Sequence, residues 1–163
     1  RHTRYISVTG VQTCALPILR VHKHLNVFPQ IVEYQVALFD GEGIVDLVWR
    51  NRDNGMLSSG SGIGPAREGW SKTPVYCFSL DKLGLTAGTA PLVKIDVEGA
   101  EFMVLNGAQE TLRRFHPKVV MEIIPKQLEA MHTSKEAVFA FMKEQGYGDG
   151  KPIDDEDWEW VAR

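Results

Sequence analysis

The chain has 163 residues, of which 44% are hydrophobic and 24% charged, and its formal net charge is −3. This length is enough for one domain with its own core, and the composition is that of an ordinary globular protein. With this charge and no strong basic block, general nucleic-acid binding is not expected, and no apolar run approaches the roughly 20 residues that span a bilayer. The two cysteines, Cys14 and Cys77, are too few for a disulfide framework or a zinc site, so we expect a cytoplasmic protein.

The first 18 residues, RHTRYISVTGVQTCALPI, follow neither a helical nor a strand period. Their apolar run is broken by Gly10, Gln12 and Thr13, which argues against a signal peptide. The segment resembles translated read-through of sequencing-adapter DNA. We therefore interpret residues 1–18 as foreign or unstructured and leave them out of the fold prediction.

From residue 30 onward the chain carries strand and turn signals. Residues 30–39 and 44–49 are rich in β-branched and aromatic residues, and the D-G-E-G turn between them predicts a hairpin. Residues 51–72 have no hydrophobic period and predict a surface loop. Residues 73–80 predict a further strand, which a short helix follows.

The second half of the chain predicts a strand, a helix and a strand in succession. Residues 91–97 form a short apolar run, and the apolar positions of residues 100–115 recur in the steps of three and four that make one helical face. Residues 118–124 predict a second buried strand. Short connections between these three elements indicate a right-handed strand–helix–strand unit whose two strands are parallel neighbours. A helix between Ser134 and Gly146 and a final strand over 158–161 complete the chain.

Carboxylates stand where the two predicted parallel strands end. Asp96 and Glu98 follow the first strand and Glu122 lies near the end of the second, at the sheet edge where ligands of α/β proteins bind. If strand geometry persists to Glu98, its side chain and that of Asp96 point to the same side. Structural alternatives stay open, because Glu98 and Glu101 could cap the helix start and Asp96 could pair with Lys94.

The string KIDVEGAE at residues 94–101, followed by Leu105, Gly107-Ala108 and Glu122, resembles the FkbM-type methyltransferases. The resemblance implies an α/β fold with a Rossmann-like class I methyltransferase sheet that is mostly parallel, and S-adenosylmethionine as cofactor. The first strand and glycine loop of the family are not found in this sequence. The resemblance therefore implies a partial methyltransferase domain over residues 19–163 that is missing its first strands.

The resemblance also assigns roles to single residues. The catalytic candidates are Asp96 and Glu98. The cofactor-binding candidates are Ala37, Leu38 and Asp96, the first two through backbone beside the adenine. The substrate-binding candidates are Ser58, Ser59 and Glu122. The implied reaction is O-methylation of a hydroxyl on a sugar, a glycan or a secondary metabolite.

Two other functions stay open at this point. Without the cofactor loop, the chain could be a non-catalytic α/β fragment that binds no cofactor. Alternatively, Asp96, Glu98 and Glu122 could bind a divalent cation through their oxygens, a hypothesis that we rank below methyl transfer. The acidic run over residues 154–157 is typical of a solvated loop.

Overall fold

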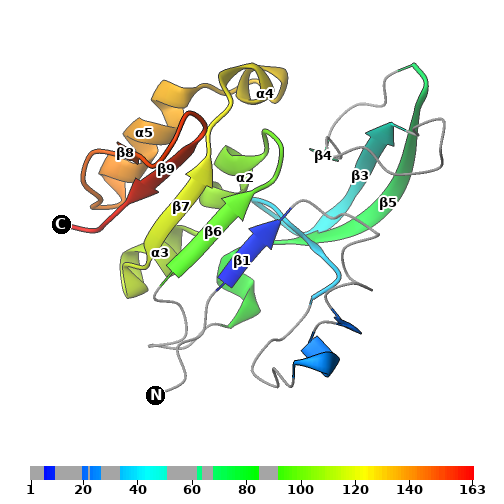
Figure 1. Ribbon diagram of the computed structural model, residues 1–163, viewed down its shortest axis with the longest axis horizontal. Coiled ribbons are helices and arrows are strands. Elements are labelled where there is room, and N and C mark those ends of the chain that lie inside the picture. The colour runs from blue at the N-terminus through cyan, green and yellow to red at the C-terminus, as the bar shows by residue number, and fades with distance from the viewer. Residues whose placement is uncertain are drawn as a thin grey trace.

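The computed structural model describes residues 6–9, 20–21, 23–26, 34–50, 62–63, 68–84 and 92–163. The strands are β1 (Ile6–Thr9), β2 (Ala37–Leu38), β3 (Gly43–Arg50), β4 (Gly62–Ile63), β5 (Trp70–Phe78), β6 (Leu92–Asp96), β7 (Lys118–Glu122), β8 (Lys151–Pro152) and β9 (Asp157–Trp160). The helices are the 3-10 helix η1 (Leu80–Leu83), α2 (Glu101–Asn106), α3 (Gln109–Phe115), α4 (Pro125–Ala130) and α5 (Lys135–Glu144). Figure 1 shows the long strands β3 and β5 to one side of the sheet that contains β6 and β7.

A five-stranded sheet in the order β1-β6-β7-β9-β8 holds the centre of the fold. Its first three strands are parallel, as predicted for β6 and β7, whereas β9 runs antiparallel to both β7 and β8. Both sheets are mixed, so the prediction of a mostly parallel sheet is not confirmed. For β8 and β9 the reason is chain length, because the few residues between them allow a hairpin and not a parallel crossover.

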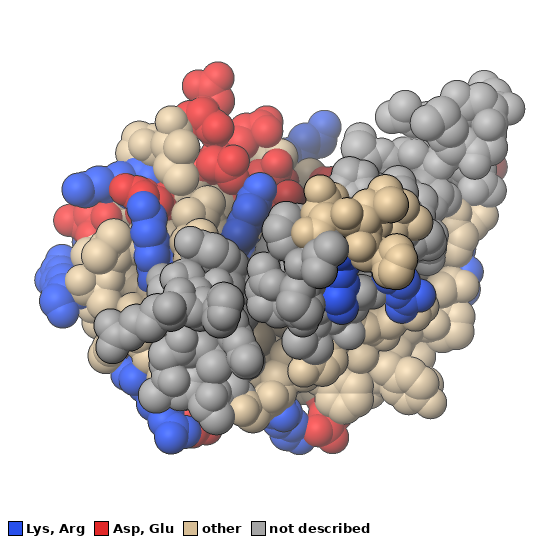
Figure 2. Space-filling view, turned by 60° about the horizontal axis from the view of Figure 1, so that its bottom comes forward, with Lys and Arg blue, Asp and Glu red and all other residues tan. Residues whose placement is uncertain are grey.

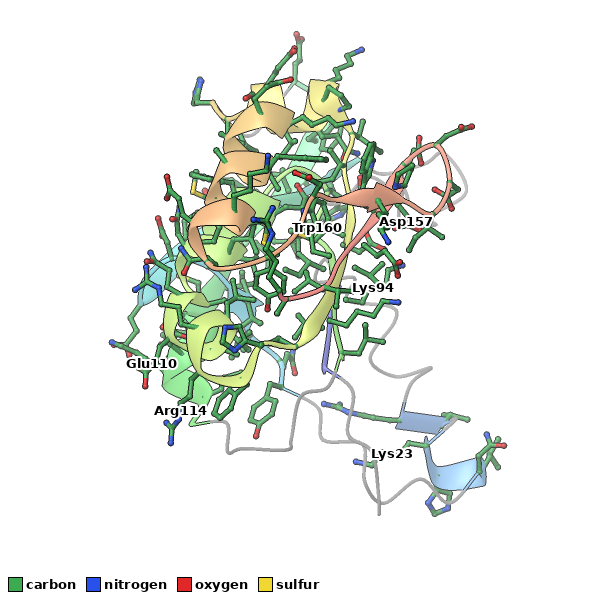
Figure 3. All side chains as sticks on the ribbon, turned by 90° about the vertical axis from the view of Figure 1, so that its left-hand side faces the viewer. Lys23, Lys94, Glu110, Arg114, Asp157 and Trp160 are labelled. Carbon is green, nitrogen blue, oxygen red and sulfur yellow. The ribbon has the colours of Figure 1, made fainter. Side chains whose placement is uncertain are left out.

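The core lies between this sheet and the helices α2 to α5. Alternate residues of β6 and β7 are buried there, namely Val93 and Ile95 on β6 and Val119 and Met121 on β7. Figure 3 shows Trp160 of β9 pointing toward the helices and Lys94 of β6 pointing away from them. The period of two along each strand therefore separates a buried face from a polar one.

The second sheet has the order β2-β5-β3-β4, and its pairing corrects the predicted hairpin. We expected residues 30–39 to pair with residues 44–49 across the D-G-E-G turn. Instead β3 pairs along its whole length with β5, and β2 pairs with the other edge of β5 at two positions. Because β5 lies between them, β2 and β3 share no pairs, and the long ladder with β5 outweighs a local turn signal.

The predicted helix over residues 100–115 is interrupted at Gly107. α2 ends at Asn106 and α3 begins at Gln109. Asp81 of η1 explains the new start, because its two carboxylate oxygens accept from the N–H groups of Glu110 and Thr111 at 3.0 and 2.8 Å. A side chain distant in sequence thus satisfies the first donors of α3, which sequence periodicity does not reveal.

Strand β1 also differs from expectation. Residues 1–18 were interpreted as foreign or unstructured, and their foreign origin stays a prediction; the fold was expected to be missing its first strands. Ile6–Thr9 instead pairs in parallel with β6, where it satisfies backbone groups of what would otherwise be an open edge. Ile6 to Thr9 do alternate apolar and polar residues, a short strand signal that was left out because the whole segment was interpreted as foreign. In the part of the chain that is described, helices all fall short of the length and apolarity needed to cross a bilayer.

Candidate active site

The candidate site begins at the last residue of β6. Val93 and Ile95 are buried against the helices, so alternation places Lys94 and Asp96 on the opposite face of the sheet. The Lys94 Nζ lies 3.6 Å from Asp96 Oδ2, and both side chains are partly exposed. The predicted Lys94–Asp96 pair is therefore present, but an ion pair this exposed contributes little stability. It leaves the Asp96 carboxylate accessible at the carboxyl end of the strand.

The chain leaves strand geometry immediately after Asp96. Glu98 has a φ of +56° and Gly99 a φ of +108°, so two successive residues are in the left-handed region. The condition that strand geometry persists to Glu98 is therefore not met. A Cβ on Gly99 would lie 2.7 Å from the carbonyl oxygen of Gln127, so glycine is needed for both its φ and its contact with α4. The turn thus redirects Glu98 toward α4.

Glu98 is held by α4 and lies beside the second sheet. Gln127 Nε2 donates to Glu98 Oε2 at 2.6 Å. A Cβ built on Gly62 of β4 would lie 3.5 Å from the Glu98 Cβ, which places β4 against this turn. Burial, and after it the charges of Asp96 and Glu156, raise the pKa of Glu98, while the bond from Gln127 acts in the opposite direction. Glu98 is therefore near Asp96 and is not a helix cap.

Glu101 was expected to cap the helix start, but it bonds to the turn that precedes α2 instead. Its side chain is buried, and its Oε1 accepts from the N–H groups of Gly99 at 3.1 Å and Val97 at 3.3 Å. Burial raises the pKa of Glu101, although these two hydrogen bonds favour the charged form. A buried carboxylate therefore fixes the backbone that links Asp96 to α2.

Glu122 completes the site from the neighbouring strand. β6 and β7 pair in parallel up to Ile95 and Met121, so Asp96 and Glu122 are the next residues on adjacent strands. Burial raises the pKa of Glu122 to about 7, and the charges of Asp96, Glu98 and Glu156 add to this shift. Acidic side chains also gather at the upper edge of the face shown in Figure 2. The structure thus brings Asp96, Glu98 and Glu122 together, as predicted.

We expect Glu122→Gln to change how stability depends on pH. The pKa of Glu122 is about 7 in the folded chain and 4.5 without its surroundings, so the folded chain binds the proton more tightly. The free energy of unfolding should then fall as pH rises from about 4.5 to about 7, because deprotonation above the unfolded pKa favours the unfolded chain. The glutamine variant does not lose stability in this way. Near pH 8 it should be more stable than the unsubstituted chain by about 1 kcal/mol, after discounting for solvent screening.

Urea unfolding of both proteins near pH 4.5 and pH 8 measures this difference. Glu129→Gln, at an exposed glutamate of α4, is the matched control and should leave the pH dependence unchanged. Equal pH profiles for the Glu122 variant and the unsubstituted chain would show that Glu122 titrates like an ordinary surface carboxyl.

The other predicted site residues are not brought to this cluster. Ala37 is buried in β2, and the carbonyl oxygen of the following Phe39 approaches Gly107 at the far end of α2. The Asp96 turn meets the opposite end of α2, so the two regions are separated by the length of that helix, roughly 9 Å. Leu38 pairs with Phe78 in the second sheet. Ser58 and Ser59 lie outside the described residues.

The described residues do not support a metal centre. Within them, there is no group of three or more histidine, cysteine, aspartate or glutamate side chains arranged to hold an ion. The cysteine in that part of the chain, Cys77, is buried as a free thiol in β5. The carboxylates at the ends of β6 and β7 are therefore close enough to repel one another without converging on a single cation position.

The sequence profile of the methyltransferase FkbM domain matches residues 30–148, which is more than half of the chain. This chain belongs to the FkbM methyltransferase domain family. Among the curated proteins, none matches it.

A solved structure agrees with the assignment to the FkbM family. The crystal structure of the methyltransferase FkbM from Methylobacillus flagellatus KT aligns with a TM-score of 0.53 and 12% sequence identity. The alignment covers 90% of this chain and 32% of the Methylobacillus protein, so the chain spans about a third of that protein's length. At this identity the likeness shows a common α/β fold.

Sequence reasoning missed one residue of the candidate site, Gln127. It lies on the short helix α4, and its contact with Glu98 spans 29 positions in the chain. Pro125 at the first turn of α4 was the available signal, because proline is favoured there. The proline indicates where α4 begins, but it does not reveal that Gln127 contacts Glu98.

Proposed function

We propose that this domain binds S-adenosylmethionine and transfers its methyl group to a hydroxyl of a sugar, a glycan or a secondary metabolite. The observation that carries the proposal is the meeting of Asp96, Glu98 and Glu122 at the carboxyl ends of two adjacent parallel strands in an FkbM-family chain. That edge is where α/β sheets bind ligands. We propose that the methyltransferase part covers residues 19–163 and acts in the cytoplasm on a small-molecule or glycan acceptor.

The charge of the site fits the proposed cofactor. S-adenosylmethionine carries a positive sulfonium and a positive ammonium group, and carboxylates that repel one another are stabilised by a nearby cation. Asp96, Glu98 and Glu156 all raise the pKa of Glu122 by repulsion, so the local field favours positive charge. We propose that Asp96 contacts the cofactor. The adenine contacts proposed for Ala37 and Leu38 rest on the family resemblance.

The carboxylates have complementary roles in this proposal. When bound, S-adenosylmethionine supplies an electrophilic methyl group. Asp96 orients the acceptor hydroxyl, and Glu98, fixed by Gln127, assists from the second position of the turn. Glu122 takes the hydroxyl proton, because a pKa of about 7 matches a general base to neutral pH. Ser58 and Ser59 are proposed to contact the acceptor.

Calorimetric titration with S-adenosylhomocysteine, the demethylated cofactor, tests this proposal. We expect saturable binding, and at about 100 times the dissociation constant a gain of about 3 kcal/mol in the free energy of unfolding. A flat titration with no thermal stabilisation would favour the non-catalytic fragment. Stabilisation by magnesium or calcium, but not by S-adenosylhomocysteine, would favour the metal-dependent enzyme instead.

A further inference from the structure

Glu101 is a buried charge whose position is unusual for a helix-capping residue. Its side chain is 1% exposed, and it lies in the first turn of α2. Its Oε1 accepts from two N–H groups that belong to the preceding turn, those of Val97 and Gly99. Successive backbone N–H groups around left-handed residues form an anion-binding concavity, and here the anion is supplied by the chain itself.

The residue between these two donors is Glu98. Its φ of +56° is rare for a residue other than glycine, and such a conformation persists only where the surroundings enforce it. The bonds to Val97 and Gly99 clamp the backbone on both sides of Glu98, while Gln127 holds its carboxylate at 2.6 Å. The left-handed turn and the direction of the Glu98 side chain therefore depend on the Glu101 oxygen.

The same clamp reaches Asp96, because Val97 follows it directly. The N–H of Val97 is the first donor beyond the end of β6, and its bond to Glu101 sets where the strand stops. A different path after Asp96 would move the Asp96 and Glu98 carboxylates relative to Glu122 on β7. The buried carboxylate of Glu101 thus keeps the three carboxylates of the candidate site at their spacing.

We propose that Glu101 is a positioning residue, whose buried carboxylate holds the Val97–Gly99 turn so that Asp96 and Glu98 face Glu122 in the ligand-binding geometry. The inference rests on the proposed function for its ligand, S-adenosylmethionine, but the turn itself can be tested without that ligand. What matters is that a Glu101 oxygen lies within hydrogen-bond distance of the N–H groups of Val97 and Gly99, and the negative charge of Glu101 is secondary.

Two substitutions separate geometry from charge. Glu101→Gln keeps an oxygen at the same reach and removes the charge, whereas Glu101→Asp keeps the charge and shortens the side chain by one methylene. We expect the aspartate variant to lose amide-exchange protection at Val97 and Gly99 by about tenfold and to bind S-adenosylhomocysteine about tenfold more weakly. The glutamine variant should stay within about threefold of the unsubstituted chain in both measurements.

Glu110 supplies the matched control, because it is an exposed glutamate on the neighbouring helix α3. Glu110→Asp and Glu110→Gln should leave both the two amides and the affinity unchanged. Measurements at a temperature where every variant is folded by circular dichroism separate positioning from lost stability. A role in stability alone would lower the melting temperature and leave the affinity of the folded protein unchanged, which would overturn the proposal.

The reverse order of effects would also overturn it. If the glutamine variant lost protection and affinity while the aspartate variant kept both, charge and not reach would be the property that matters. If the unsubstituted chain bound no S-adenosylhomocysteine, the proposed function would fail, and the amide comparison at Val97 and Gly99 would still support or refute the role of Glu101.

Discussion

Replacing Gly107 with alanine is expected to destabilise the chain by about 3 kcal/mol, although alanine is the better helix former by about 1 kcal/mol. A Cβ at this position would lie 2.0 Å from the carbonyl oxygen of Phe39 and 3.1 Å from the Cβ of Ser79. The first neighbour is backbone and cannot rotate away. The φ of Gly107 is −81°, which alanine adopts freely, so the whole effect comes from the close approach and none from backbone strain.

Urea denaturation of Gly107→Ala measures this loss. Gly41→Ala is the matched control, since a Cβ at Gly41 would have no neighbour within 4 Å, and it should change the free energy of unfolding by less than about 1 kcal/mol. Should Gly107→Ala prove as stable as the unsubstituted chain, or more stable, helix propensity would dominate. The packing of Phe39 against the α2–α3 junction would then be looser than described.

Asp96→Asn is expected to reduce methyl transfer by about a hundredfold, as lost positioning of the acceptor does, while leaving the fold intact. In the proposed function the Asp96 carboxylate orients the acceptor hydroxyl, and an amide of the same shape lacks the charge for this. Stability should change by less than about 1 kcal/mol, because Lys94 lies 3.6 Å away in a partly exposed pair. Formation of S-adenosylhomocysteine with a panel of sugars and other hydroxyl compounds measures turnover.

Asp46→Asn is a suitable control for Asp96→Asn, because Asp46 also belongs to an exposed ion pair, with Lys72 on the second sheet. That variant should retain turnover. Unchanged turnover in Asp96→Asn would remove Asp96 from the chemistry, and Glu122 would remain the candidate base. If the chain alone forms no product, the same two variants can be compared by their affinity for S-adenosylhomocysteine.

Elements with a strong local period were predicted well. β6 and β7 lie within the predicted strands, and the helix expected after Ser134 is α5, with the Ser134 hydroxyl accepting from the N–H of Ala137 at 3.2 Å. β9 begins one residue before the predicted final strand. In β6, β7 and α5 the buried face repeats at the period of the element, so the pattern of apolar residues carries the information.

Elements whose pairing depends on distant residues were predicted less well. The hairpin was assigned to the wrong neighbour because the turn signal is local, whereas the β3–β5 ladder joins residues up to 34 positions apart, as in the pair Gly43–Cys77. The break between α2 and α3 depends on Asp81 and Phe39, which are far from Gly107 in the chain. A short stretch of sequence does not contain these contacting residues together, so local patterns cannot predict their contacts.

The sequence by itself determined the family, the parallel β6–β7 pair and the three carboxylates at its carboxyl end, because motif, alternation and strand order are properties of neighbouring residues. Only the tertiary structure decided how those carboxylates are held. The left-handed turn at Glu98 and its bond to Gln127 depend on α4 and β4 packing against the turn, and Glu101 is buried behind it. Burial and mutual repulsion, which set the pKa of Glu122, exist only when separate strands and helices meet.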